Sequence, residues 1–185
     1  TGVQTCALPI CMGVDFPIVQ GPFGGGHSSV ALTATVSRLV GVGSFGCQPY
    51  TAGEIVDHVR AIRQVADKPF SLNLWVNDRD ARLANYGAAD YEKLIAIFKP
   101  YFELAGIRAP AMPGDLGPRY EDQLEAIFGT RPAVFSFVYG IPEPDVLERC
   151  RRNGTKTVGT ATTVDEAVAL EKAGVDAVVA TGFEA

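Results

Sequence analysis

Short, almost continuously apolar runs alternate along this chain with segments whose apolar residues recur at helical spacing. Such runs are typical of parallel strands that are covered on both faces, because neither side of the strand meets water. The alternation predicts an α/β fold in which right-handed crossovers connect parallel strands. The six expected strands are residues 17–20, 39–45, 69–75, 133–138, 156–160 and 176–181.

Capping signals mark the helices between these strands. Thr51 with Glu54, and Thr163 with Glu166, have the spacing of a capping box, and Gly174 stands where the second of these helices should end. Apolar residues then recur at helical spacing through residues 55–65. Further helices are expected from Ser28 or Ser29 to about residue 37 and over 143–153, the latter closed by Gly154.

Some forty residues, from Asn77 to about Pro118, are inserted between the third strand and its helix. Within them, 90–105 has helical character and Pro100 is expected to break or kink that helix. A loop rich in proline and glycine follows over 109–118, and a helix over 120–128 returns the chain to the fourth strand. Because the insertion follows a strand, we expect it at the carboxyl edge of the sheet, where α/β proteins bind their ligands.

The two ends differ from the rest of the chain. Residues 1–10, TGVQTCALPI, resemble the translation of a sequencing adapter, so we interpret 1–11 as an artefact and 12–185 as the domain. The chain stops just after the sixth strand, without the final helix of a doubly wound sheet. A complete (βα)8 barrel needs eight strands and about 250 residues. We therefore expect a truncated TIM-type (βα)8 barrel with about six of its eight parallel strands.

Composition narrows the possible partners. The chain has 185 residues, 47% of them hydrophobic, and a net charge of -5, which argues against a nucleic-acid partner. No apolar run approaches the roughly 18 residues of a membrane span. Apart from two cysteines in the first eleven residues, only Cys47 and Cys150 remain, far apart, which predicts neither a disulfide framework nor a metal site and favours the cytoplasm.

Two features of the predicted carboxyl edge could carry chemistry. Residues 17–26 read PIVQGPFGGG, and glycines directly after a strand let a ligand approach the backbone. They match neither a dinucleotide-binding nor a P-loop motif, so a flexible loop explains them equally well. Asn73 lies in the apolar run FSLNLW, and a buried amide needs a partner. That partner is either the edge of a flavin or another protein group.

Taken together, these segments resemble the nitronate monooxygenase family. The resemblance rests on PIVQGPFGGG (17–26), LVGVGSFG (39–46), PFSLNLWV (69–76) and the tail 157–185. In this family the sixth strand leads into a G-x-E-A-G-G-H motif, and Gly182-Phe-Glu-Ala185 matches its first four residues. The resemblance implies a TIM barrel that binds FMN and oxidises alkyl nitronates or nitroalkanes with O2, giving carbonyl compounds and nitrite.

The resemblance also implies roles for individual residues. Pro22, Phe23 and Gly24 would contact FMN after the first strand, and Asn73 would bond to its ring edge or adjoining atoms. Thr181 would lie near FMN, although relatives often have Gln or Asp there. The catalytic histidine of the motif would lie beyond Ala185, so no catalytic residue is expected within this chain, and the fragment alone should be inactive.

Other interpretations remain open. His27 is expected at the rim of the barrel, His58 on the outer surface of its helix, and Tyr139 either lining the substrate or packing in the wall. An FMN-dependent enoyl reductase shares the barrel and similar glycines in its first loop. A barrel that binds a flavin or another phosphate ligand without catalysis is the alternative outside the enzymes. For the leading interpretation the partners are a small-molecule substrate and O2, with no nucleic acid and no membrane.

Overall fold

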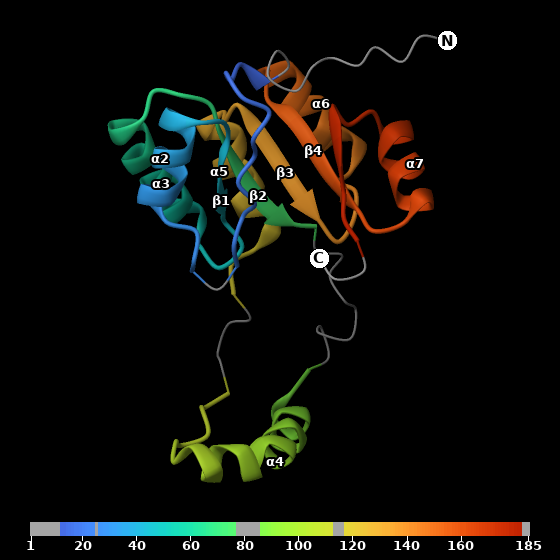
Figure 1. Ribbon diagram of the computed structural model, residues 1–185. Helices are drawn as coiled ribbons and strands as arrows, with labels where there is room; N and C mark the ends of the chain where they lie inside the picture. Colours follow the sequence, from blue (N-terminus) through green and yellow to red (C-terminus); the bar gives the residue numbers. More distant parts are fainter. Residues whose placement is uncertain (1–11, 25, 77–85, 113–116, 183–185) are drawn as a thin grey trace. The chain divides into compact units, whose positions relative to one another are not determined.

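The chain forms two compact units, Thr1–Val76 with Pro118–Ala185, and Asn77–Gly117. Our computed structural model describes residues 12–24, 26–76, 86–112 and 117–182 (Figure 1). The first unit contains the sheet and the helices around it, and the second contains α4 (Ala88–Ala105). The adapter-like residues 1–11, Gly25 of the glycine loop and the end of the tail motif lie outside the described residues.

The sheet of the first unit is entirely parallel, and each strand pairs with the next one in the chain. This order is that of a TIM barrel, whereas a doubly wound sheet reverses its order at a switch point. The expected α/β fold of a partial barrel is therefore confirmed. The strands in the described residues are β1 (Gly43–Gly46), β2 (Phe70–Trp75), β3 (Val134–Val138), β4 (Lys156–Ala161) and β5 (Ala177–Ala180).

The first expected strand, residues 17–20, is shorter than predicted. It pairs with the chain before β1 through a single parallel bridge between Val19 and Val42, where the Gln20 N–H donates to Val42 O at 2.9 Å. The prediction for 39–45 was wrong at its start, because α2 (Val30–Leu39) continues to Leu39 and the Val40 N–H still donates to Val36 O. Little extended chain is then left to pair with residues 17–20.

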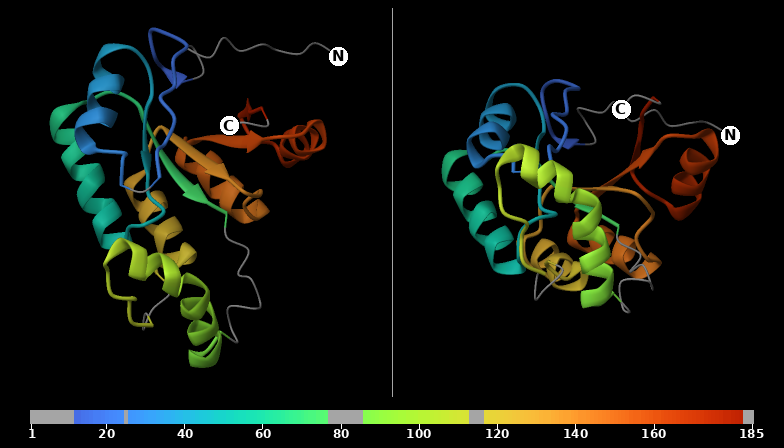
Figure 2. Two further views of the ribbon diagram at one scale, coloured as in Figure 1. Left: turned by 60° about the horizontal axis from the view of Figure 1, so that its bottom comes forward. Right: turned by 90° about the horizontal axis from the view of Figure 1, so that it is seen from below.

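Helices cover the outer face of the curved sheet, and α2 packs beside α3 on one flank (Figure 2). Both capping boxes are confirmed, with reciprocal bonds between Thr51 and Glu54 and between Thr163 and Glu166. Ser29 caps α2 by accepting from the Leu32 N–H at 3.1 Å. Besides α2, these helices are α3 (Ala52–Val65), α5 (Tyr120–Thr130), α6 (Pro144–Asn153) and α7 (Val164–Ala173).

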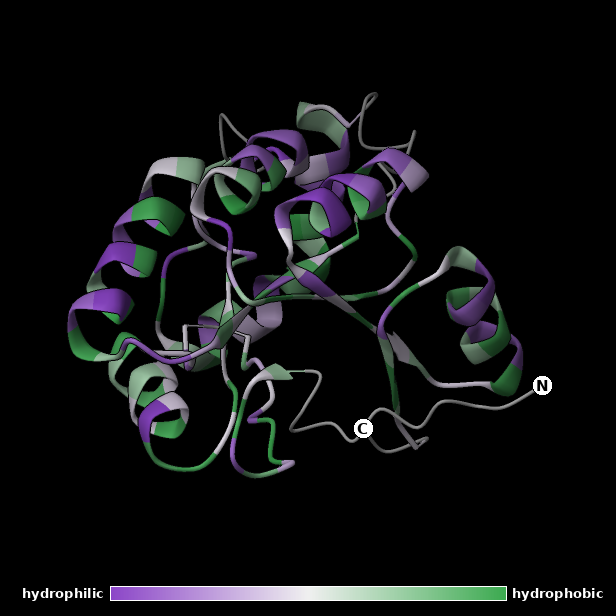
Figure 3. Cartoon of the chain, turned by 90° about the horizontal axis from the view of Figure 1, so that it is seen from above, coloured by the Kyte–Doolittle hydropathy of each residue, from purple (hydrophilic) through white to green (hydrophobic). Residues whose placement is uncertain are grey.

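The two faces of the strands differ in polarity. Phe45, Leu72 and Phe135 are fully buried and belong to the core between the strands and the helices, which Ile55 and Leu170 join from the helix side. Hydrophobic and hydrophilic residues interleave along the helices, as expected of amphipathic helices (Figure 3). The opposite face, called the polar inner face below, carries Ser44, Ser71, Asn73 and Ser136 beside a smaller apolar cluster of Met12, Val42, Val134 and Val158. This polar inner face positions the candidate site.

The second unit is built around α4. The helix begins at Ala88, ends with Gly106 in the left-handed conformation (φ 65°), and passes through Pro100 without a break. None of its described side chains is buried. Among the helices that the structure describes, none is both long enough and apolar enough to cross a membrane.

Asp176 joins the starts of β4 and β5. Its carboxylate accepts from Lys156 Nζ at 2.8 Å and from the N–H and hydroxyl of Thr157, each at 2.9 Å. Burial raises the pKa of this carboxyl group, but the hydrogen bonds from Lys156 and Thr157 outweigh it, so the net pKa is lowered. A lowered pKa stabilises the fold above the pKa of the unfolded state and loses this effect as the pH falls.

We predict that Asp176→Asn lowers the free energy of unfolding by roughly 1–2 kcal/mol at pH 7, a low value because the site is partly solvated. Urea unfolding at a series of pH values measures this, and the difference from the parent protein should shrink below about pH 4. Asp57→Asn is the control, since the Asp57–Arg60 pair is exposed and its loss should change stability little. A difference that persists unchanged at pH 3 would contradict the role of the carboxylate.

Candidate active site at the carboxyl ends of the strands

The loop after residues 17–20 is held against the end of β1. The Phe23 N–H donates to Ser28 Oγ at 2.9 Å, and the Ser28 hydroxyl donates to Phe23 O at 3.1 Å. A Cβ at Gly46 would lie 3.0 Å from Phe23 O, so glycine lets the loop approach the strand closely. The space where a Cβ of Gly24 would stand is open, and the Phe23 side chain is 52% exposed. This loop therefore offers open backbone and an apolar ring.

Asn73 is buried in the polar inner face next to this loop. In the register of the sheet it pairs with Gly46 of β1 and Ser136 of β3, and its side chain is 5% exposed. Its Nδ2 donates to Ser136 Oγ at 3.1 Å, and Ser71 donates to the same oxygen at 3.2 Å. Among the described residues, none donates a hydrogen bond to Asn73 Oδ1. One half of the amide thus makes a structural bond, and the other half is available to a ligand.

Thr181 lies just past the end of β5, at the same carboxyl edge. Its N–H donates to Ala161 O at 2.9 Å, and its hydroxyl donates to the same oxygen at 3.3 Å. In the described part of the chain, no hydrogen bond joins Thr181 to Asn73 or to the loop of Pro22, Phe23 and Gly24. The structure thus brings the loop and Asn73 to the end of β1, and places Thr181 separately on the edge strand.

The two histidines of the chain differ in their surroundings. His27 is exposed after the glycine loop, where its N–H donates to Gly24 O at 3.3 Å. The prediction that His58 lies on the outer surface was wrong. Its half-buried ring packs against Phe45 and Tyr50, with centroid distances of 4.8 and 4.5 Å, because the loop after β1 folds Tyr50 over α3.

Cys47, directly after β1, is unreactive. The side chain is fully buried, and burial raises the pKa of the thiol to about 12. A thiol with this pKa holds almost no thiolate, the nucleophilic form, at neutral pH. Cys47 therefore fills space at the edge of the site.

Sequence reasoning missed Ser71, Trp75, Gln123 and Ser136 at this edge, and it named Tyr139 without its aromatic partner. Ser71 and Ser136 repeat the signal that singled out Asn73, a polar residue in an otherwise apolar strand. Trp75 and Tyr139 form an edge-to-face pair with ring centroids 5.2 Å apart. Gln123 of α5, fully buried, donates through Nε2 to the backbone oxygens of the loop after β1, namely Cys47, Gln48 and Tyr50. No local pattern in the sequence indicates the last two features.

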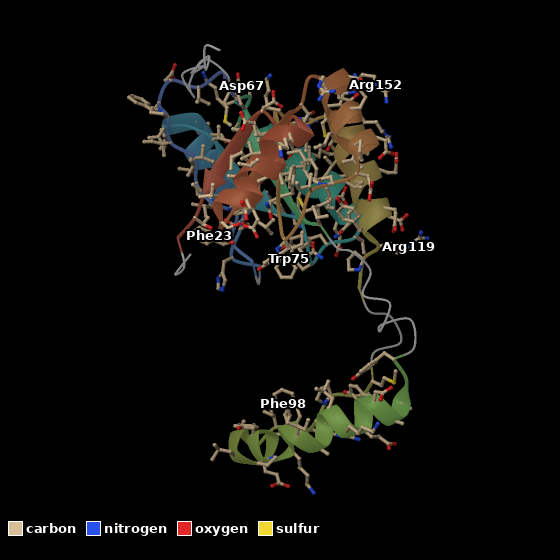
Figure 4. All side chains as sticks on the ribbon, turned by 90° about the vertical axis from the view of Figure 1, so that its right-hand side faces the viewer. Phe23, Asp67, Trp75, Phe98, Arg119 and Arg152 are labelled. Carbon is tan, nitrogen blue, oxygen red and sulfur yellow. The ribbon has the colours of Figure 1, made fainter. Side chains whose placement is uncertain are left out.

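A hollow of about 370 Å³ lies between α5 and α6, far from this edge. Arg152, one of its lining residues, lies at the opposite end of the sheet from Phe23 and Trp75 (Figure 4). Inside it, the Arg149 guanidinium stacks on Phe128 at 3.7 Å and forms a two-point ion pair with Glu125. Its polar groups already bond to one another, so we place the site at the carboxyl edge instead.

Known proteins resemble this chain over most of its length. The family model described as nitronate monooxygenase matches residues 7–185. The chain belongs to the nitronate monooxygenase family. A nitronate monooxygenase of Paraburkholderia phytofirmans is 35% identical over 181 residues, which cover 96% of this chain and 48% of that protein. This chain thus spans about half the length of the relatives that it matches.

Solved structures extend the likeness to the fold. The nitroalkane oxidase of Streptomyces ansochromogenes superposes with a TM-score of 0.77 at 32% identity, covering 93% of this chain and 48% of that one. FabK from Thermotoga maritima superposes with a TM-score of 0.69 at 21% identity, covering 96% of this chain and 44% of that one. The FabK likeness, at this identity, shows the fold alone.

Proposed function

We propose that this chain belongs to a flavin-dependent oxidoreductase, which binds FMN at the carboxyl edge and oxidises alkyl nitronates or nitroalkanes with O2 to carbonyl compounds and nitrite. Family membership supports the reaction class. The observation that carries the site is the half-satisfied amide of Asn73, buried beside a glycine loop with open backbone. The proposed partners are a small-molecule substrate and O2.

The residues at this edge fit a flavin. Asn73 Oδ1 would accept from a ring N–H, and the adjacent inner face keeps the amide fixed through Ser136. The open backbone at Gly24 admits a flat ring, and Phe23 would cushion it with an apolar surface. Pro22, Phe23, Gly24, Asn73 and Thr181 would together hold FMN, Thr181 through its hydroxyl oxygen.

In the proposed mechanism FMN supplies the electron acceptor and the reactivity towards O2. The part of this chain would be to orient the flavin. The amide of Asn73, fixed by Ser136, would set the ring position, and the Phe23 ring would cover one side of it. We assign the substrate proton neither to His27, which is exposed, nor to His58, whose ring packs against Phe45 and Tyr50. We propose that the histidine of the family motif is the base.

One experiment tests the proposal. The protein, expressed with its full natural reading frame, should show flavin absorbance, consume O2 with an alkyl nitronate and release nitrite. NADH or NADPH with an enoyl thioester is the comparison, because turnover of that pair without nitronate turnover would instead assign an enoyl reductase. Bound flavin without turnover of either substrate would assign a non-catalytic flavin-binding barrel. Absence of bound flavin would contradict the proposed flavin site at the carboxyl edge. The inactivity of residues 1–185 alone and the cytoplasmic location remain predictions.

A further inference from the structure

Two exposed aromatic rings stand at the carboxyl edge beside the proposed flavin site. Trp75 ends β2 and Tyr139 follows β3, and their rings meet edge to face, with an interplanar angle of 86°. Trp75 is 39% exposed and Tyr139 77% exposed. Large aromatic surface is costly to leave in water. The pair is thus an apolar surface that the core of this unit does not use.

The pair continues the inner face that carries Asn73. Side chains alternate along a strand, and Phe70, Leu72 and Leu74 of β2 all belong to the core under the helices. Ser71 and Asn73 lie on the other face, where both bond to Ser136. Trp75 therefore shares the face of Asn73, about 7 Å further toward the carboxyl edge.

Backbone contacts fix the pair in place. The Trp75 N–H donates to Gln48 Oε1 at 3.0 Å. Gln48 is itself fixed, because Nε2 of buried Gln123 donates to Gln48 O at 3.0 Å. The Val76 N–H donates to Val138 O at 2.9 Å and so ties together the strand ends that carry the two rings. These bonds hold the backbone that carries the two rings, while the rings themselves stay exposed.

Tyr139 has a left-handed backbone, with φ 69°. This conformation is unfavourable for a bulky residue that is not glycine. The ring gains no burial in return, since it is largely exposed. Strained residues that contribute little to packing concentrate at binding sites.

We propose that Trp75 and Tyr139 form the wall that binds the hydrocarbon chain of the substrate, so that the enzyme prefers nitronates with long alkyl or aryl groups over short ones. This inference rests on the proposed function, in which Asn73 would hold the flavin on the same face of the sheet as the wall. Each methylene that the wall removes from water should improve binding about fourfold. The preference should stop growing once the chain extends past the two rings.

The test uses the full-length protein with its flavin and two series of probes. Alkyl nitronates from ethyl to hexyl give KM values under O2. Straight-chain alkanoates from acetate to hexanoate imitate the planar anion without being oxidised, and their binding is followed by tryptophan emission. Trp75 is the single tryptophan of this chain, so the signal lost in Trp75→Phe is the part that reports the wall.

We expect both KM and the alkanoate dissociation constant to fall about fourfold per methylene in the parent protein and to become nearly independent of chain length in Tyr139→Ala. Tyr139→Phe should retain the parent behaviour, because the ring and not the hydroxyl makes the wall. Phe16→Ala, which removes another half-exposed ring before residue 17 at the amino end of the sheet, is the matched control and should also retain it.

The proposed role of the two rings would be wrong if KM and the alkanoate dissociation constant still depended on chain length in Tyr139→Ala. It would also be wrong if that dependence were lost in Tyr139→Phe. A parent protein that binds flavin and oxidises nitronates without any dependence on chain length would overturn it as well, while leaving the proposed function intact. A parent protein without flavin or nitronate turnover would instead reject the proposed function. Flavin absorbance, recorded for every variant, separates these cases.

Discussion

Gly43→Ala is expected to destabilise the protein by about 4 kcal/mol or more, enough to unfold a marginally stable domain. A Cβ at Gly43 would lie 2.1 Å from Thr33 O and 2.8 Å from the carbonyl carbon of the same residue. Both are backbone atoms of α2, so no side-chain rotation relieves the overlap. The helix would have to move away from β1 and break the bonds from the Gly43 N–H to Ser37 Oγ and from the Thr33 hydroxyl to Ser44 O.

Thermal and urea unfolding measure this effect, and Gly53→Ala provides the control. Gly53 is an exposed residue in the first turn of α3, where no atom stands within 4 Å of the added Cβ. There alanine should raise stability by roughly 0.5–1 kcal/mol, because glycine costs more backbone entropy in a helix. Equal unfolding midpoints for Gly43→Ala and the parent protein would mean that α2 does not approach β1 this closely in solution.

The same contact explains why the start of the strand expected over 39–45 was predicted wrongly. Residues 39–45, LVGVGSF, are continuously apolar, and such a run does not distinguish the end of a helix from the start of a strand. Two close backbone contacts decide the boundary. Gly43 admits the backbone of Thr33 in α2, and Gly41 admits the backbone of Ile18, both at distances that no side chain tolerates. These contacts are tertiary features. The central strands and the capped helices were predictable because their signals are local.

The candidate site likewise has residues that local sequence indicates and residues that only the tertiary structure brings together. Asn73 could be selected from sequence because an amide in an apolar strand needs a partner, and Ser136 provides it for Nδ2. The Trp75–Tyr139 pair depends on the register between β2 and β3, together with the left-handed turn at Tyr139. The position of His58 depends on how Tyr50 folds back over α3. Neither is encoded by a spacing along the chain.

Asn73→Ala is expected to weaken FMN binding by roughly 1–3 kcal/mol, which is about a 5- to 150-fold rise in the dissociation constant. The change removes the oxygen proposed to accept from the ring and leaves Ser136 without its partner at Nδ2. Titration of the flavin-free protein with FMN, followed by flavin fluorescence, gives the constant. Asn153→Ala is the matched control, because Asn153 donates weakly to Phe128 O and lines the hollow between α5 and α6.

Ser136→Ala separates a direct role of Asn73 from an indirect one. It keeps Asn73 Oδ1 and removes only the bond that holds the amide, so its effect on FMN should be smaller than that of Asn73→Ala. Ser71 and Asn73 would lose the same acceptor in this variant, and the unfolding midpoint should therefore fall. Equal FMN affinity in Asn73→Ala and the parent would remove Asn73 from the site. Equal losses in both variants would show that Asn73 acts only by supporting the inner face.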